Sequence, residues 1–171
     1  MLKKSIEVAL NKQINAEFHS AYLYLSMSSY LQSIGMAGCS NWMKVQYQEE
    51  LAHATHFFDY ILERGGRVEL FPIGDVTVNF KNVLEVFEET LTHEVQVTGL
   101  INNLMDICIR ESDHASKNFL QWFVDEQVEE ESNVEQILNN LKLINGEGQG
   151  LLMMDREMQT RVFVNPFPAK A

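Results

Sequence analysis

Four long segments of this chain carry apolar residues at helical spacing, and this pattern restricts the fold more than any other feature. The segments span residues 5–34, 40–64, about 80–110 and about 114–144. Residues that recur at alternating steps of three and four lie on one face of an α-helix, so each segment predicts a long amphipathic helix. No stretch shows the two-residue alternation of a half-buried strand. The expected fold class is therefore all-α.

The connecting segments predict how these helices are arranged. The links "SIGMAG" at 33–38 and "ESD" at 111–113 are short, so each should join two antiparallel neighbours. The link "RVELFPIGDVTVN" at 67–79 is long enough to run the length of a bundle, which would leave the second and third helices parallel. Links that are short, long and short predict a four-helix bundle with one long crossover.

The end of the chain departs from this pattern. The glycines of "NGEGQG" at 145–150 interrupt the fourth helix, and residues 151–162 predict a short fifth helix. Residues 163–171, "FVNPFPAKA", are expected to form an irregular tail. A chain of this length supports one core of useful size, so residues 1–162 are expected to form a single domain.

Composition narrows the partners and the compartment. The formal net charge of −11 argues against a nucleic acid or an anionic membrane as partner, because both need a basic face. No apolar run approaches the roughly 18 residues that cross a bilayer, and the first residues develop no secretory signal. Cys39 and Cys108 lack zinc-type spacing and suit a reducing environment. A cytoplasmic protein is the expectation.

Polar residues interrupt the middle of every apolar stripe. They are Glu17 in the first helix, Glu50 and His53 in the second, Glu94 in the third, and Gln127 and Glu130 in the fourth. Glu17 and Glu50 are 33 positions apart, and the second pair, Glu94 and Gln127, repeats that interval 77 positions later. The chain therefore contains two related hairpins, one with Glu then E-x-x-H and one with Glu then Q-x-x-E.

Carboxylates on a core stripe require compensation. An unpaired carboxylate in a bundle core costs several kcal/mol, and four of them would cancel a net stability of about 5–15 kcal/mol. No Lys or Arg lies in the helix middles, at 13–43, 45–63, 82–109 or 118–141. Protonation of the carboxyl groups is one alternative. Bound cations are the more economical explanation.

The donor set indicates which cations fit. Carboxylates with one imidazole and no thiolate disfavour structural zinc and copper and suit iron or manganese. The histidine argues against a calcium or magnesium site. Gln127 could hold a water or oxygen ligand by hydrogen bonds. The sequence thus predicts a two-metal site whose ligands are Glu17 and His53 for one ion, Glu94 and Glu130 for the other, and Glu50 as the bridge.

A second acidic group borders this site. Glu49, Glu126 and Glu129 lie at the edge of the stripe, each about 100° around its helix from a core ligand. Alone, the segment "DEQVEEES" is typical of a solvated acidic face. Beside the core site it could also form a third cation position, with Glu130 touching both groups.

The motifs that carry these residues resemble those of bacterial non-haem ferritins, in the ferritin-like di-iron family. The resemblance runs to about residue 160 and rests on "NAEFHSAYLYL", "QYQEELAHA", "THEVQVTGLI" and "FLQWFVDEQVEEE". It implies a ferroxidase centre that binds two Fe(II), oxidises them with O2 or H2O2, and passes ferric ions to a mineral inside a 24-subunit shell. It also implies a third iron site at the edge glutamates and redox roles for Tyr24 and Trp122.

Single residues separate this family from its relatives. A bacterioferritin would have methionine at Leu51 and histidine at Glu130, so haem binding is not expected. A rubrerythrin would need a four-cysteine module, which two scattered cysteines cannot form. Two further readings stay open: an enzyme that uses the same centre on an organic substrate or peroxide, and a metal-free helical interaction protein whose carboxylates lie on the surface.

Overall fold

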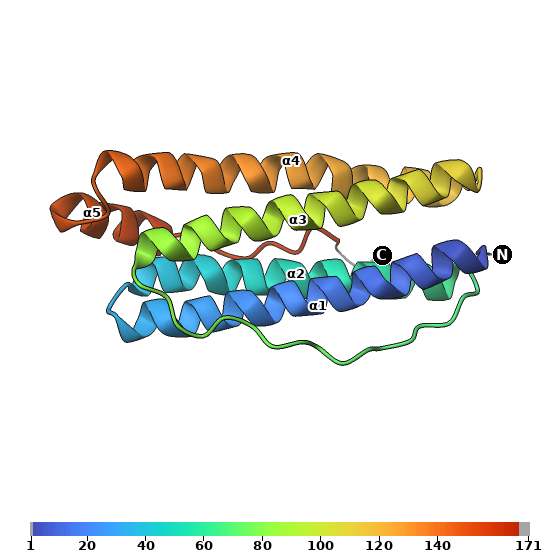
Figure 1. Ribbon diagram of the computed structural model, residues 1–171, viewed down its shortest axis with the longest axis horizontal. Coiled ribbons are helices and arrows are strands. Elements are labelled where there is room, and N and C mark those ends of the chain that lie inside the picture. Colours follow the sequence, from blue (N-terminus) through green and yellow to red (C-terminus); the bar gives the residue numbers. More distant parts are fainter. Residues whose placement is uncertain (1, 168–171) are drawn as a thin grey trace.

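The computed structural model describes residues 2–167 and contains five helices and no strand within that range (Figure 1). The all-α prediction is confirmed. The helices are α1 (Lys4–Ser33), α2 (Ala37–Glu63), α3 (Val83–Arg110), α4 (His114–Leu143) and α5 (Gly148–Met158).

The first four helices form a bundle of two antiparallel pairs (Figure 1). Helix α2 folds back along α1, and α4 folds back along α3. The segment between α2 and α3 passes along the outside of α1 from one end of the bundle to the other, so α2 and α3 run parallel. The predicted connectivity of short, long and short links is confirmed.

Side chains of α1 hold this crossover by its backbone. Asn11 donates to the carbonyl of Arg67 at 3.0 Å and accepts from the amide of Glu69 at 2.7 Å. Asn15 and Ser26 hold carbonyls further along the segment, those of Phe71, Pro72 and Thr77. A segment without helix or strand thereby has several backbone groups paired, as a chain that crosses a protein surface requires.

The starts of α2 and α3 differ from the predicted positions. Helix α2 begins at Ala37 rather than at residue 40, and Gly38 therefore lies inside it. A Cβ atom at Gly38 would lie only 1.5 Å from the carbonyl oxygen of Asp155 in α5, so this glycine permits close packing of α5 on α2. Helix α3 begins at Val83 rather than near 80, because the side chain of Asn82 caps it by accepting from the amide of Glu85.

The fifth helix spans Gly148–Met158 instead of 151–162. Its C-terminal boundary is four residues earlier than predicted because the chain turns away at Gln159. The side-chain amide of Asn41 then donates to the carbonyls of Met158, Gln159 and Arg161 at 3.2, 3.4 and 2.9 Å. Of the predicted tail, residues 163–167 are irregular, and 168–171 lie outside the described residues.

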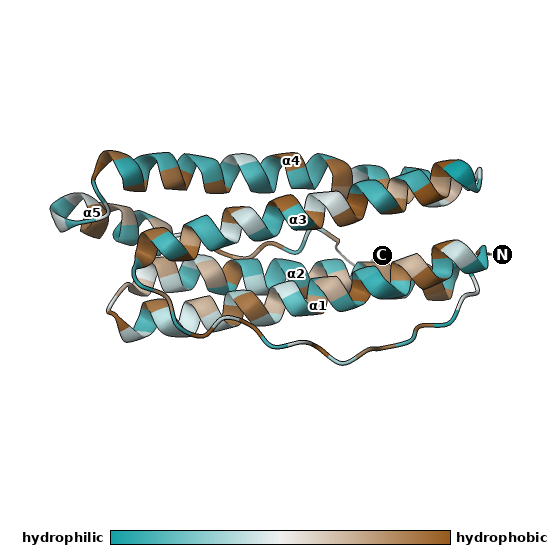
Figure 2. Ribbon diagram, viewed as in Figure 1, coloured by the Kyte–Doolittle hydropathy of each residue, from teal (hydrophilic) through white to brown (hydrophobic). Residues whose placement is uncertain are grey.

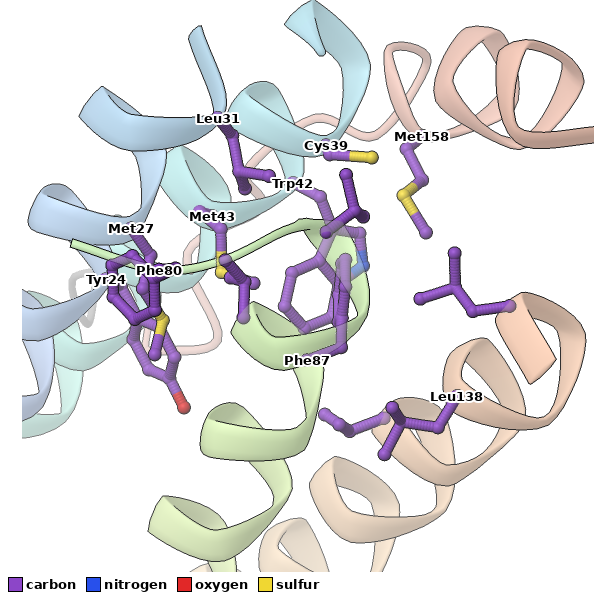
Figure 3. Close-up of a cluster of buried hydrophobic side chains, with 14 of the residues drawn as sticks. Tyr24, Met27, Leu31, Cys39, Trp42, Met43, Phe80, Phe87, Leu138 and Met158 are labelled. Carbon is purple, nitrogen blue, oxygen red and sulfur yellow. The ribbon is translucent and has the colours of Figure 1, made fainter. Parts of the chain in front are cut away.

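The bundle contains two separate apolar clusters, and each helix carries alternating apolar and polar positions along its length (Figure 2). One cluster lies beside α5 and includes Trp42 and Phe87, whose rings meet edge to face at 5.3 Å (Figure 3). The other lies toward the opposite end and includes Phe57 and Phe123, whose rings stack at 4.1 Å. Six buried polar residues lie on the helices between these clusters: Glu17, Glu50, His53, Glu94, Gln127 and Glu130. No helix within residues 2–167 is both long and apolar enough to cross a membrane.

Candidate metal centre

A belt of buried polar side chains separates the two apolar clusters. It contains every residue predicted from the core stripes: Glu17, Glu50, His53, Glu94, Gln127 and Glu130, each exposed by 6% or less. The reading in which these carboxylates lie on the surface is therefore wrong. Four helices contribute to this belt because each long helix keeps its stripe pointed inward past the bundle middle.

Glu17, Glu50 and His53 form the tightest part of the belt. Each offers one ligand atom, and the three atoms lie within 4.8 Å of one another. The Nδ1 of His53 is 3.6 Å from the Oε2 of Glu50, one helical turn away along α2. Both Oε2 of Glu50 and Nε2 of His53 are buried and form no hydrogen bond with any of residues 2–167. A cation site requires buried ligand atoms that are not already occupied by hydrogen bonds, and these two atoms meet that requirement.

Glu94 and Glu130 occupy the other half of the belt. The hydroxyl of Tyr24 donates to Oε1 of Glu94, and the amide nitrogen of Gln127 donates to its Oε2 at 3.1 Å. Gln46 donates to Oε2 of Glu130 at 2.8 Å. These two carboxylates therefore have protein partners already, unlike the free oxygen of Glu50. The hydrogen bonds fix the orientation of both carboxylates, as donors behind metal ligands commonly do.

Burial shapes the protonation of the belt. It raises the pKa of Glu17, with Glu50 adding to the effect, and it raises the pKa of Glu50, with Glu94 adding to the effect. Burial and then the charge of Glu130 raise the pKa of Glu94 to about 7. Carboxyl groups that share a dry site cannot all ionise without a counter-charge. A bound cation would supply that charge and displace the protons.

Aromatic rings lie against both halves of the belt. Trp122 approaches the His53 ring edge to face at 5.4 Å, and Phe123 does so at 5.7 Å. Tyr24 is fully buried, and burial followed by the charge of Glu94 raises its pKa well above the ordinary value. Tyr24 and Trp122 thus contact predicted ligands on opposite halves of the belt.

The edge glutamates are less buried than the belt. Glu49 and Glu126 are half-buried, while Glu129 is exposed. Burial raises the pKa of Glu49 to about 7 although the charge of Arg161 opposes it. The Nη2 of Arg161 donates to Oε2 of Glu49 at 2.7 Å. The helix middles contain no basic residue, but Arg161, which follows α5 in the chain, brings a positive charge to the edge glutamates.

Two functional contacts escaped the sequence analysis. Gln46 is fully buried and its neighbour Tyr47 only half-buried, and helical periodicity did not single out Gln46. The available signal was its spacing, since Gln46 precedes Glu50 by four positions, about one helical turn. Arg161 carried no such signal, because the tail has no periodicity and its position depends on Asn41, which is 120 positions away.

Two hollows lie near the belt without opening onto its carboxylates. One of about 920 Å³ is lined by His56, Phe119 and Phe167, among others, and contains none of the predicted ligands. The other, of about 390 Å³ between α3 and α4, reaches Gln127 past Thr98 and Glu131. Access to the belt from this side therefore passes the amide of Gln127.

Comparison with known proteins gives consistent results over nearly the whole chain. A family model described as the ferritin-like domain matches residues 7–144. A bacterial non-heme ferritin of Bacteroides fragilis (strain 638R) is 40% identical, with 94% of this chain and 100% of that protein covered. One from Staphylococcus aureus (strain MRSA252) is 35% identical, with 95% and 98% covered.

Solved structures agree in fold as well as in sequence. A closed form of the Archaeoglobus fulgidus ferritin, engineered by mutagenesis, superposes with a TM-score of 0.94 at 48% identity and covers 96% of this chain and 100% of its own. A structure described as an open pore ferritin from the same archaeon gives 0.92 at 48% identity, with 94% and 98% covered. The bundle, its crossover and the short fifth helix therefore form a ferritin fold.

Proposed function

This chain belongs to the ferritin-like domain family, and from that premise we propose that it stores iron and oxidises ferrous ions inside its helical bundle. The single observation that carries the proposal is the buried cluster of Glu17, Glu50 and His53, in which two ligand atoms have no hydrogen-bonding partner within the described chain. If these positions served only to pack the helices, apolar residues would stabilise the bundle more than buried carboxylates do.

Two ferrous ions are the substrate of the proposed reaction. Each loses one electron, and one O2 accepts both electrons with two protons to give H2O2, or one H2O2 accepts them with two protons to give two waters. Glu17 and His53 would hold one ion, Glu94 and Glu130 the other, and Glu50 would bind both. Carboxylates favour the harder ferric product, so the ligand set itself assists the oxidation.

The remaining belt residues would position these ligands. Tyr24 and Gln127 hold the two oxygens of Glu94, and Gln127 also borders the hollow between α3 and α4. These contacts support the proposal that Gln127 orients an incoming oxidant or water. Tyr24 and Trp122 are proposed to supply electrons to the centre. Haem is not expected, because Leu51 and Glu130 replace the residues that would hold it.

Storage requires a container, and the proposed one is a homo-oligomeric shell of 24 subunits with ferric mineral inside. The structural relatives support this, since their descriptions refer to closed and open-pore forms of a ferritin. Glu49, Glu126 and Glu129, with Glu130, would form a third iron site on the route from the centre to the mineral. The proposed location is the cytoplasm, where ferrous iron is available.

The enzyme that acts on an organic substrate is the rival reading. It requires a substrate cavity at the metal ligands, and the larger hollow is bordered by Phe167 rather than by a ligand carboxylate. The smaller hollow reaches Gln127 alone among the predicted site residues. Neither hollow supports an organic substrate at the centre as directly as the belt supports two small ions.

Mixing metal-free protein with Fe(II) in air tests the proposal. Ferric absorbance should rise within seconds to minutes, faster than in buffer alone, and the product should be an iron-bearing particle of shell size on a sizing column. The test variant is His53→Ala, which removes one ligand from the tightest cluster. The matched control is His114→Ala, which removes an exposed histidine. Equal, buffer-like oxidation by all three proteins would overturn the proposal.

A further inference from the structure

The segment after α5, residues 159–167, is attached to α2 at two points. Near its start, the side-chain amide of Asn41 donates to the carbonyl of Met158, the last residue of α5, and to those of Gln159 and Arg161. Near its end, the ring of Phe167 stacks on His56 with centroids 3.8 Å apart and also meets Trp122 at 4.5 Å. The two anchor residues of α2 are about 22 Å apart along the helix. The segment runs back along the bundle (Figure 1), and the ring of Phe167 lies 6.1 Å from that of His53, so the segment passes the predicted metal centre.

Between these anchors the segment places one positive charge on the outer glutamates. Arg161 donates from Nη2 to Glu49 at 2.7 Å, and its guanidinium carbon lies 4.6 Å from the centre of the Trp42 ring. The side chain of Arg161 is 26% exposed and that of Glu49 is 18% exposed, so water screens the pair only partly. The Trp42 ring adds a cation–π contact that holds the guanidinium in place.

We propose that Arg161 is the resident cation of the outer glutamate group and occupies the position at Glu49 that a third metal ion would otherwise take. This inference rests on the proposed function, because it concerns the iron site at the edge of the same centre. It makes Arg161 a residue that determines how strongly that site holds iron.

The geometry makes this occupation reversible. Only one of the two terminal nitrogens binds Glu49, while Nη1 is buried and forms no hydrogen bond within the described part of the chain. A single-donor pair is weaker than a bidentate arginine–carboxylate pair. A tethered group still competes strongly, because its effective concentration is on the order of millimolar. A third ion would therefore bind Glu49 only in competition with Arg161. An iron ion would then stay bound at the outer glutamates for only a short time.

Zinc(II) titration of the full-length assembled protein tests this without redox chemistry. The variant Arg161→Gln removes the charge and keeps a side chain of comparable length. The matched control is Arg156→Gln, which removes the same charge from an exposed position on α5. We expect Arg161→Gln to bind a third zinc ion about tenfold or more tightly than the unmodified protein, while Arg156→Gln binds it no more tightly. Arg161→Lys should bind the third zinc ion as weakly as the unmodified protein does, since lysine keeps the positive charge.

A second substitution locates the effect. Glu49→Gln introduced into the Arg161→Gln protein should abolish the gain in third-ion affinity, and anomalous scattering from zinc-soaked crystals should show the extra ion beside Glu49 only when Arg161 is replaced. If the gain in affinity came only from loosening of the segment 159–167, it would not depend on Glu49, and Arg161→Lys would not reverse it.

The outcomes separate the two proposals. Two tightly bound inner ions with unchanged third-ion affinity in Arg161→Gln would overturn the role of Arg161 and leave the iron centre intact. Absence of the two inner ions from every variant, in anaerobic Fe(II) titration as well as with zinc, would overturn the proposed function, and the inference with it.

Discussion

Gln46 and Glu130 are 84 positions apart in the chain, yet the amide nitrogen of Gln46 donates to the Oε2 of Glu130 at 2.8 Å inside the bundle. Both side chains are buried, and Oε1 of Gln46 has no hydrogen-bonding partner among residues 2–167. The contact orients a proposed ligand of the second ion from a helix that already supplies Glu50 and His53. Helix α2 therefore contacts the ligands of both proposed ion positions.

Replacement of Gln46 by methionine should weaken the second ion position. Methionine keeps the length of the side chain and removes the donor to Glu130, and loss of such a partner typically lowers metal affinity about 10–100-fold. Anaerobic titration with Fe(II) should show the second ion weakened and the first nearly unchanged. Gln48→Met, at an exposed position on the same helix, serves as control. Equal affinities in both variants would contradict the positioning role.

Glu50 and Glu129 should differ sharply in their effect on oxidation. Glu50 is buried with a free oxygen in the tightest cluster, whereas Glu129 is exposed at the edge. We expect Glu50→Ala to slow the initial rapid oxidation by roughly 100-fold or more, as loss of a metal ligand does, and Glu129→Ala by a few-fold at most. Stopped-flow absorbance of ferric product measures both rates. Similar rates would show that Glu50 is not the bridge.

Tyr24→Phe should slow oxidation while both ions still bind. The hydroxyl of Tyr24 holds Oε1 of Glu94, and one hydrogen bond to a charged group contributes about 1.5–3 kcal/mol. Part of that is regained by relaxation, so a rate loss of about tenfold is expected. Tyr22→Phe removes an exposed hydroxyl two positions away on α1 and should change nothing. Ion binding measured by titration separates a defect in oxidation from a defect in binding, and loss of the second ion would argue against this assignment.

The metal-free protein should lose stability as pH rises from about 4.5 to 7. Burial raises the pKa of Glu94 to about 7, above its ordinary value of 4.5. A carboxyl group with a raised pKa in the folded state stabilises that state fully below the unfolded pKa, and this stabilisation is lost as pH rises through the folded pKa. We expect a loss of roughly 1–3 kcal/mol from this group.

Thermal unfolding of metal-free protein at pH 5 and pH 8 checks this sign. Glu94→Gln removes the titrating group and should reduce the difference between the two pH values. Added metal ions should reverse the trend, because cations bind the ionised carboxylates and release protons. A metal-free protein that becomes more stable between pH 5 and pH 7 would contradict the prediction.

Gly38 and Gly99 should respond in opposite ways to alanine. A Cβ atom at Gly38 would overlap the carbonyl of Asp155, so Gly38→Ala must displace α5 and should cost about 2 kcal/mol or more. Gly99 lies in α3 with nothing within 4 Å of its added Cβ, so Gly99→Ala should stabilise the helix by about 0.5–1 kcal/mol. Denaturant unfolding measures both. Equal effects would show that α5 does not depend on this close approach.

Most of the fold and the central site could be predicted because both follow from helical periodicity. Glu17 and Glu94 share an inward-facing stripe with large apolar residues, and their spacing from the α2 and α4 residues places them at one level. Periodicity could not separate Gln46 from Tyr47, because α2 buries a broader face than one narrow stripe. It could say nothing of Arg161, whose position depends on long-range contacts of an irregular segment with Asn41 and Glu49.

The crossover along α1 shows where this chain can change. Its hydrogen bonds to Asn11, Asn15 and Ser26 use the crossover's own backbone groups, while its side chains at Leu70 and Val78 are 67% and 63% exposed. The path of the crossover is therefore encoded in α1 rather than in the crossover's own sequence. Most side chains between residues 67 and 79 could be replaced without changing the path of the chain, whereas a change at Asn11 would remove the two hydrogen bonds that hold the start of the crossover.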